Sequence, residues 1–185
     1  MKYLNKFFLI SIAIFTVGCS ILNNSIESQT NLLNEILKVH QESIDKHNKN
    51  AAHKKYGYKS KEHIMAERKK ATINKENIYK IEQFLRQHGH PSEKLHGSKL
   101  ADLPFTIFSA SSKSKKLIQR NLTYIHTAWQ QQTISDRTYI YYLQSLHSSK
   151  FKQYLRLNSP SYTEKEEIDS LATKLKIDSL LSVYK

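Results

Sequence analysis

The sequence predicts an all-α fold, with a small multi-helix domain behind a helical arm, and three observations lead to this. Apolar residues recur every three or four positions along most of the chain after residue 30, which is the spacing of one helix face. Helix-capping residues, namely Asn74, Ser135 and Thr163, stand where three of these runs begin. No convincing pair of strands is present, although residues 139–142 favour a strand by propensity alone.

The first 18 residues have the features of an export signal. Lys2 and Lys6 give a positive start, and an apolar run of 11 residues follows over 7–17, interrupted by Ser11 and Thr16. As a helix this run would cover roughly 16 Å, whereas a helix that crosses a bilayer needs about 20 residues. The run is therefore typical of a secretory signal. The alternative is a buried N-terminal helix, which would carry more alternating polar residues.

The signal ends in Thr16-Val17-Gly18-Cys19, which resembles the cleavage site of bacterial lipoproteins. Cys19 is the only cysteine of the chain, and we expect its thiol to carry a diacylglycerol after cleavage. One acyl chain holds a protein only marginally, at about 0.8 kcal/mol per buried methylene, so two or three chains are needed for stable attachment to the membrane. The alternative is an ordinary cleavage site followed by a chance cysteine.

These features predict a lipoprotein signal over residues 1–18, and the lipidated Cys19 with a polar tether over 19–29. Ser20 follows the cysteine where an aspartate would, by resemblance to enterobacterial sorting, retain the protein at the inner membrane. We therefore expect a location in the bacterial cell envelope, lipid-anchored in the outer membrane and facing the periplasm.

The charge of the chain favours anionic partners. Without Lys2 and Lys6 of the signal, 27 basic residues stand against 16 acidic ones, a formal net charge of +11 with histidine neutral. Outside the cytoplasm a basic surface can meet anionic envelope polymers and lipid headgroups, or a protein partner. Export argues against nucleic acid. The alternative is that the charge reflects composition alone, since Lys, Asn, Ile and Tyr are all abundant.

Residues 30–72 are expected to form a basic helical arm. The spacing of Leu33, Ile36, Leu37 and Ile44 predicts a helix from Thr30 to Asn50. Residues 48–72 have a weak apolar face and many positive charges, which indicates a mobile, partly helical segment. The lysines of this arm are candidate binding residues: Lys54, Lys55, Lys69 and Lys70.

Residues 74–185 are expected to form the helical domain. Asn74 is a candidate N-cap of a helix that ends at Gly89, a residue suited to the left-handed position, with Pro91 beyond it. We expect a loop over residues 89–99 and a new helix at Leu103-Pro104. Two further helices are predicted, one from the apolar face over residues 117–129 and one from Ser135 onward. After a break at Ser159-Pro160, the capping box of Thr163 and Glu166 predicts another helix. An apolar tail over 177–184 should dock on the domain.

Two groups of side chains in this domain are candidates for binding. His88, His90 and His96 surround one loop and could hold zinc or copper, with Glu93 or Asp102 as a further ligand. The alternative is that His88 only stabilises a helix C-terminus. Tyr139 and Tyr142 could share a helix face that binds a glycan or a protein, or they could line the edge of the core.

From residue 74 onward the order of motifs carries a resemblance. Gly89-His90-Pro91 ends a helix, Gly97 follows, Ile168-Asp169 begins the C-terminal motif, and the apolar spacing of 177–184 completes it. In this order the chain resembles an uncharacterised family of bacterial helical proteins, a domain of unknown function. That family has Gly-Trp-Pro, Gln-His, Asp-Arg and Gln-x-Tyr-Gly-x-Gln in succession. The resemblance implies a helical fold for residues 74–185.

The polar motifs of that family are mostly replaced in this chain. Ser109-Ala110 stands in place of Gln-His and Ser145-Leu146 in place of Asp-Arg, while Gln153-Tyr154-Leu155 keeps only the tyrosine of the turn. The resemblance therefore implies a fold and no activity.

Two functions are open at this point. No Gly-rich phosphate loop, His-Glu-x-x-His or Gly-x-Ser-x-Gly motif is present, and Glu82, Asp136 and Asp169 form no recognised pair. We expect a lipoprotein with a non-enzymatic binding or accessory role toward an anionic envelope component or a protein partner, without a cofactor. The alternative is an enzyme, such as a hydrolase, whose site is dispersed along the chain.

Overall fold

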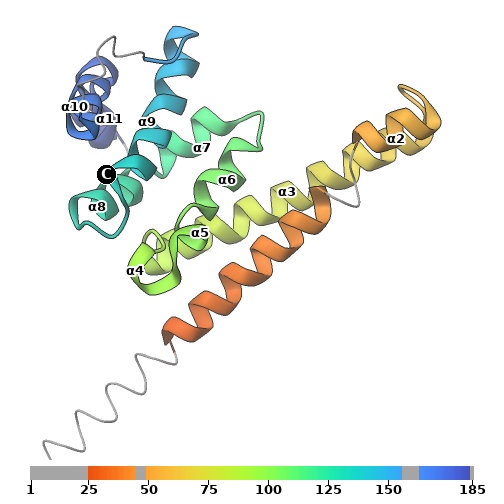
Figure 1. Cartoon of the computed structure of the whole chain (residues 1–185), viewed down its shortest axis with the longest axis horizontal. Coiled ribbons are helices and arrows are strands. Elements are labelled where there is room, and N and C mark those ends of the chain that lie inside the picture. The colour runs from red at the N-terminus through yellow and green to blue at the C-terminus, as the bar shows by residue number, and fades with distance from the viewer. Residues whose placement is uncertain (1–24, 45–48, 156–162, 184–185) are drawn as a thin grey trace, which may run out of the picture.

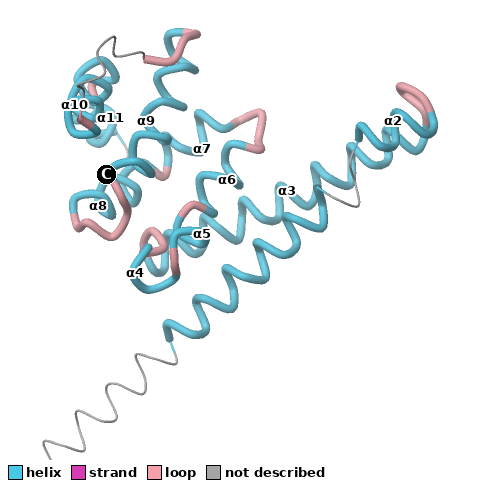
Figure 2. Tube along the Cα trace, in the orientation of Figure 1, coloured by secondary structure: helices cyan, strands magenta, loops and turns pink. Residues whose placement is uncertain are grey.

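The structure is a computed structural model, and it describes residues 25–44, 49–155 and 163–183. All regular elements of these residues are helices and none is a strand, which confirms the all-α prediction (Figure 2). The export signal, Cys19, residues 20–24 of the expected tether, the break at Ser159-Pro160 and Tyr184 lie outside the described residues. Within the described part of the chain, no helix combines the length and apolar character that a membrane crossing requires.

Two long helices form the arm. Residues 25–44 are helical and lie antiparallel beside α3, which runs over Lys61–His88 (Figure 1). Leu33 and Ile36 of the first helix are fully buried, as is Ile81 of α3. The Lys80 ammonium donates to Glu35 Oε1 at 2.7 Å across the same contact. The first helix already includes residue 25, so the last residues of the expected tether are helical.

The far end of the arm is a helical hairpin. α2, over Lys49–Tyr56, packs against the beginning of α3, so the segment expected to be partly helical is largely helical. α3 begins after Ser60, whose hydroxyl accepts a hydrogen bond from the His63 N–H at 3.1 Å. Asn74 is therefore wrong as an N-cap, because it lies in the middle of a continuous helix that crosses the expected boundary between arm and domain.

The segment after α3 is more ordered than the loop expected over residues 89–99. Gly89 has φ 76° and its N–H bonds to the Leu85 carbonyl, which confirms the predicted helix end. Two one-turn helices follow, α4 over Glu93–His96 and α5 over Ser98–Ala101. Glu93 also connects this segment to the chain before α9, because its N–H donates to the Thr133 carbonyl at 2.9 Å.

The next helices are short. α6 covers Leu103–Ser109 with Pro104 in its first turn, as predicted. The apolar face expected over 117–129 is divided between α7, Ser114–Arg120, and α8, Leu122–Gln130. The division falls at Asn121, whose side-chain amide donates to the Leu117 carbonyl at 2.9 Å and so competes with helix continuation.

The C-terminal helices follow their predicted caps. α9 covers Asp136–Phe151 and the Ser135 hydroxyl accepts from the Thr138 N–H, so residues 139–142 are helical. α10, Glu164–Leu175, opens with the capping box of Thr163 and Glu166. α11, Ile177–Val183, ends the described chain and contacts α8, while α10 packs on α9. The core joins side chains from the first helix to α11, among them Leu33, Phe84, Phe108, Ile118, Leu122, Leu143, Leu171 and Ile177.

Candidate functional site

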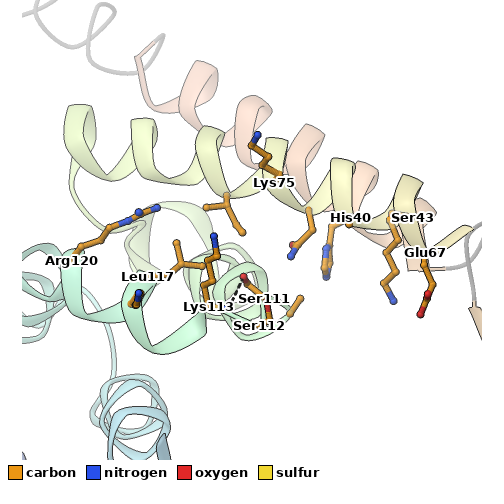
Figure 3. A pocket seen from close by; sticks show the side chains of 15 residues that line it. His40, Ser43, Glu67, Lys75, Ser111, Ser112, Lys113, Leu117 and Arg120 are labelled. Carbon is orange, nitrogen blue, oxygen red and sulfur yellow. Dashed lines mark hydrogen bonds between the residues drawn. The ribbon is translucent and has the colours of Figure 1, made fainter. Parts of the chain in front are cut away.

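A groove of about 860 Å³ lies where the arm meets the rest of the protein (Figure 3). One wall comes from the first helix and the middle of α3, and the other from the segment that joins α6 to α7 and from α7 itself. Ile78 and Leu117 supply apolar surface, and Ser43, Ser111 and Ser112 supply hydroxyl groups. The groove therefore combines a partly apolar lining with polar groups.

Both walls of the groove carry cations. Lys70 and Lys75 come from α3, while Lys113 and Lys116 come from the opposite wall, where Arg120 also lies. Glu67 is the single carboxylate among the lining residues. Among the described residues, no carboxylate forms an ion pair with these four lysines. Their ammonium groups are thus available to an anion, and two opposed walls can contact it at once.

Three further groups of the lining are polar but uncharged at neutral pH. His40 is buried on the first helix, and burial, with the positive charge of Lys70 as a second cause, lowers its pKa. The Oδ1 atom of Asn74 is buried and has no hydrogen-bond partner. The hydroxyl of Ser111 accepts from the Lys113 N–H at 3.1 Å, which fixes the turn before α7. These three groups therefore add polarity to the lining without adding charge.

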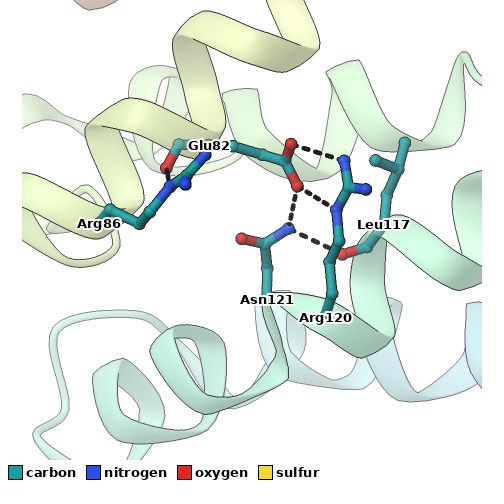
Figure 4. A network of polar contacts seen from close by, with 5 residues as sticks. All are labelled: Glu82, Arg86, Leu117, Arg120 and Asn121. Carbon is teal, nitrogen blue, oxygen red and sulfur yellow. Dashed lines mark hydrogen bonds and ion pairs between the residues drawn. The ribbon is translucent and has the colours of Figure 1, made fainter. Parts of the chain in front are cut away.

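A polar network holds the second wall in place (Figure 4). Glu82 of α3 is buried, and its carboxylate accepts from both Nε and Nη2 of Arg120, the latter at 2.6 Å. The Asn121 amide donates to the same carboxylate at 2.8 Å. Because Arg120 ends α7 and Glu82 belongs to α3, this paired contact fixes the spacing between the two walls.

The three predicted metal ligands do not form one cluster, because His88 and His96 both lie against the Phe84 ring whereas His90 bonds elsewhere. His90 is buried; its Nδ1–H donates to the Pro91 carbonyl at 3.0 Å and its Nε2 accepts from the Tyr142 hydroxyl at 2.9 Å. His96 accepts from the Ser92 N–H at 3.1 Å, and His88 lies against the Phe84 ring. Within the described ranges no group of three or more His, Cys, Asp or Glu side chains could hold a metal ion.

The predicted tyrosine surface is instead part of the core. Tyr139 and Tyr142 retain 1% and 0% of their exposure, and burial raises the pKa of both phenols. The Tyr139 hydroxyl bonds to His126 Nδ1 at 2.7 Å. Their spacing of three residues places both on the inner face of α9, deeper than the core edge of the stated alternative, and both hydroxyls bond to histidines. Tyr141, between them, is the exposed residue.

The arm lysines divide between two places. Lys54 and Lys55 are exposed on α2, Lys69 is exposed on α3, and Lys70 lines the groove. The sequence reasoning missed Lys75, Lys113 and Lys116. For Lys113 and Lys116, the available signal of a basic surface was the run of serines and lysines over residues 111–116, which holds three lysines and no acidic residue.

Comparisons of the chain with models of protein families, with curated proteins and with solved structures give no match. The family resemblance from residue 74 onward therefore stays an expectation.

Proposed function

We propose that this protein is a cell-envelope lipoprotein with a non-enzymatic role, which binds an anionic envelope component in the groove. The observation that carries the proposal is the pair of opposed cationic walls, whose four lysines outnumber the one carboxylate of the lining, Glu67. An anionic polymer with phosphate or carboxylate groups fits such a groove, because successive charges can meet lysines on both walls.

Two further observations support this proposal. The excess of basic residues holds over the whole chain, so a negative polymer is attracted before it reaches the groove. Cys19, if lipidated, keeps the groove at a membrane surface, where anionic polymers of the envelope are concentrated.

The groove gives the enzyme alternative no comparable support. A hydrolase of the serine type needs its nucleophile bonded to a base. In the described part of the chain, no hydrogen bond joins His40 to a groove hydroxyl of Ser43, Ser111 or Ser112.

Co-sedimentation with isolated envelope fractions tests the proposal. The protein is used as residues 19–185 with Cys19→Ser, which keeps the whole described structure. Purified peptidoglycan and lipopolysaccharide are each offered over a series of salt concentrations. We expect saturable binding to one of them that weakens as salt rises, because salt screens exposed charges. Absence of binding to both, or binding that salt leaves unchanged, would contradict the proposal.

A further inference from the structure

The turn between α2 and α3 exposes two aromatic side chains at the end of the arm. We call residues 54–61 the arm tip; it is the part of the arm that projects beyond the other helices (Figure 1). Tyr56 and Tyr58 are 50% and 69% exposed. Exposed aromatic side chains that lie close together can mark a site of interaction.

The arm tip is built to hold these side chains in place. Gly57 has φ +90° and its N–H bonds to the His53 carbonyl at 2.9 Å, while Lys59 has φ 62°. The Tyr58 ring lies 5.5 Å from each of the His53 and His63 rings, measured between centroids. Tyr58 is thus fixed on one side and open to solvent on the other.

The charge of the arm tip is entirely positive. Lys54, Lys55, Lys59 and Lys61 lie within it and it contains no acidic residue. The ammonium groups of Lys55 and Lys59 lie over the rings of Tyr56 and Tyr58, at 5.1 and 5.6 Å from the centroids. Tyrosines beside lysines are the combination that the interface of an anionic bilayer favours, where rings lie at the headgroups and ammonium groups meet lipid phosphates.

We propose that the arm tip docks on the surface of an anionic bilayer, with Tyr56 and Tyr58 at the level of the headgroups and the four lysines against lipid phosphates. We infer a bilayer as the partner because the arm tip combines positive charge with interleaved aromatic rings. The surface is separate from the groove: Lys70, the groove lysine closest in sequence, lies nine residues beyond Lys61 on α3, roughly 14 Å along the helix. Binding at one place therefore does not depend on the other.

Vesicle co-sedimentation of residues 19–185 with Cys19→Ser tests the docking. We expect binding to vesicles that contain phosphatidylglycerol and little binding to vesicles of phosphatidylcholine alone. The triple variant K54Q/K55Q/K59Q should bind the anionic vesicles at least about tenfold more weakly, because each lysine adds to the attraction. It removes the Lys59 ammonium from the Tyr58 ring but keeps the contacts of that ring with His53 and His63, so the hairpin stays folded.

Two controls separate the arm tip from the rest of the protein. K94Q/K165Q/K174Q removes the same charge from exposed positions elsewhere and should bind anionic vesicles like the parent protein. K113Q/K116Q removes two charges from the groove and leaves the arm tip unchanged, so it should also bind anionic vesicles like the parent protein. Equal loss in the arm-tip variant and in K94Q/K165Q/K174Q would overturn the proposal, as would equal binding to both kinds of vesicle. Binding to neither kind, with capture of a soluble acidic protein instead, would also overturn it.

Discussion

Glu82 on α3 accepts two hydrogen bonds from the guanidinium of Arg120 at the end of α7. The two residues are 38 positions apart, and their pairing connects the arm to the opposite wall of the groove. The position of Lys113 and Lys116 relative to α3 therefore depends on a buried carboxylate that does not itself face the proposed ligand.

Substitution of Glu82 tests this relationship. Glu82→Gln removes the charge and one acceptor, so Arg120 and Asn121 lose part of their bonding. We expect the free energy of unfolding to fall by about 1–3 kcal/mol, toward the lower end because Arg120 is half exposed. Urea denaturation measures it, with the exposed Glu76→Gln on the same helix as control. An equal, small effect in both variants would show that the pair does not fix the wall.

His90 predicts a dependence of stability on pH. Burial lowers its pKa to about 4, below the ordinary value of 6.5, so the folded protein keeps the ring neutral while the unfolded chain takes up a proton. The contribution of this shift to the free energy of unfolding is complete above pH 6.5. It is lost as pH falls from 6.5 to 4, by about 3 kcal/mol in total. In denaturation across this window, His90→Gln should show a shallower loss than the parent protein. Identical slopes would contradict the assignment.

The hydrogen bond of Tyr142 to His90 makes a second stability prediction. Tyr142→Phe leaves the buried Nε2 atom of His90 without its donor, because Nδ1 is already bonded to the Pro91 carbonyl. The cost should be about 1–3 kcal/mol, that of one unsatisfied buried acceptor. Thermal unfolding would report it as a lower Tm. Tyr154→Phe removes a hydroxyl from an exposed ring and should leave Tm unchanged; a similar Tm for both variants would refute the prediction.

Local signals in the sequence predicted local structure well. The caps at Ser135 and Thr163 and the helix end at Gly89 are confirmed, since each depends on residues within four positions. Asn74 misled for the same reason. It is a good capping residue, but it lies inside a helix that already has Ser60 as its cap and whose buried apolar residues, Ile81, Phe84 and Leu85, follow Asn74.

The groove could not be predicted because it depends on tertiary contacts. Its walls combine residues 40–43, 67–78 and 110–120, and no local pattern shows that these segments meet. The same holds for Tyr142, whose place in the core is set by His90, 52 positions earlier. Charge counts indicated an anionic partner for the chain, but not which lysines would face one another.

Lipidation of Cys19 is open to a direct test. Cells that express the full chain are fed an alkynyl palmitate, and the protein is examined for incorporated label. We expect label on the parent protein and none on Cys19→Ala, because no other cysteine is available. The label should remain in Ser20→Ala, which leaves the thiol in place. Label on Cys19→Ala, or none on the parent protein, would exclude the predicted anchor.

The most direct test of the groove as an anion-binding site is calorimetric titration with the envelope polymer selected by co-sedimentation. It compares residues 19–185 carrying Cys19→Ser with the same protein carrying K113Q/K116Q. Both lysines are exposed, so the fold should survive. The account predicts at least about tenfold weaker binding and a smaller salt dependence for the groove variant, while K94Q/K174Q binds like the parent protein. Equal affinity of the groove variant and the parent protein would contradict the account.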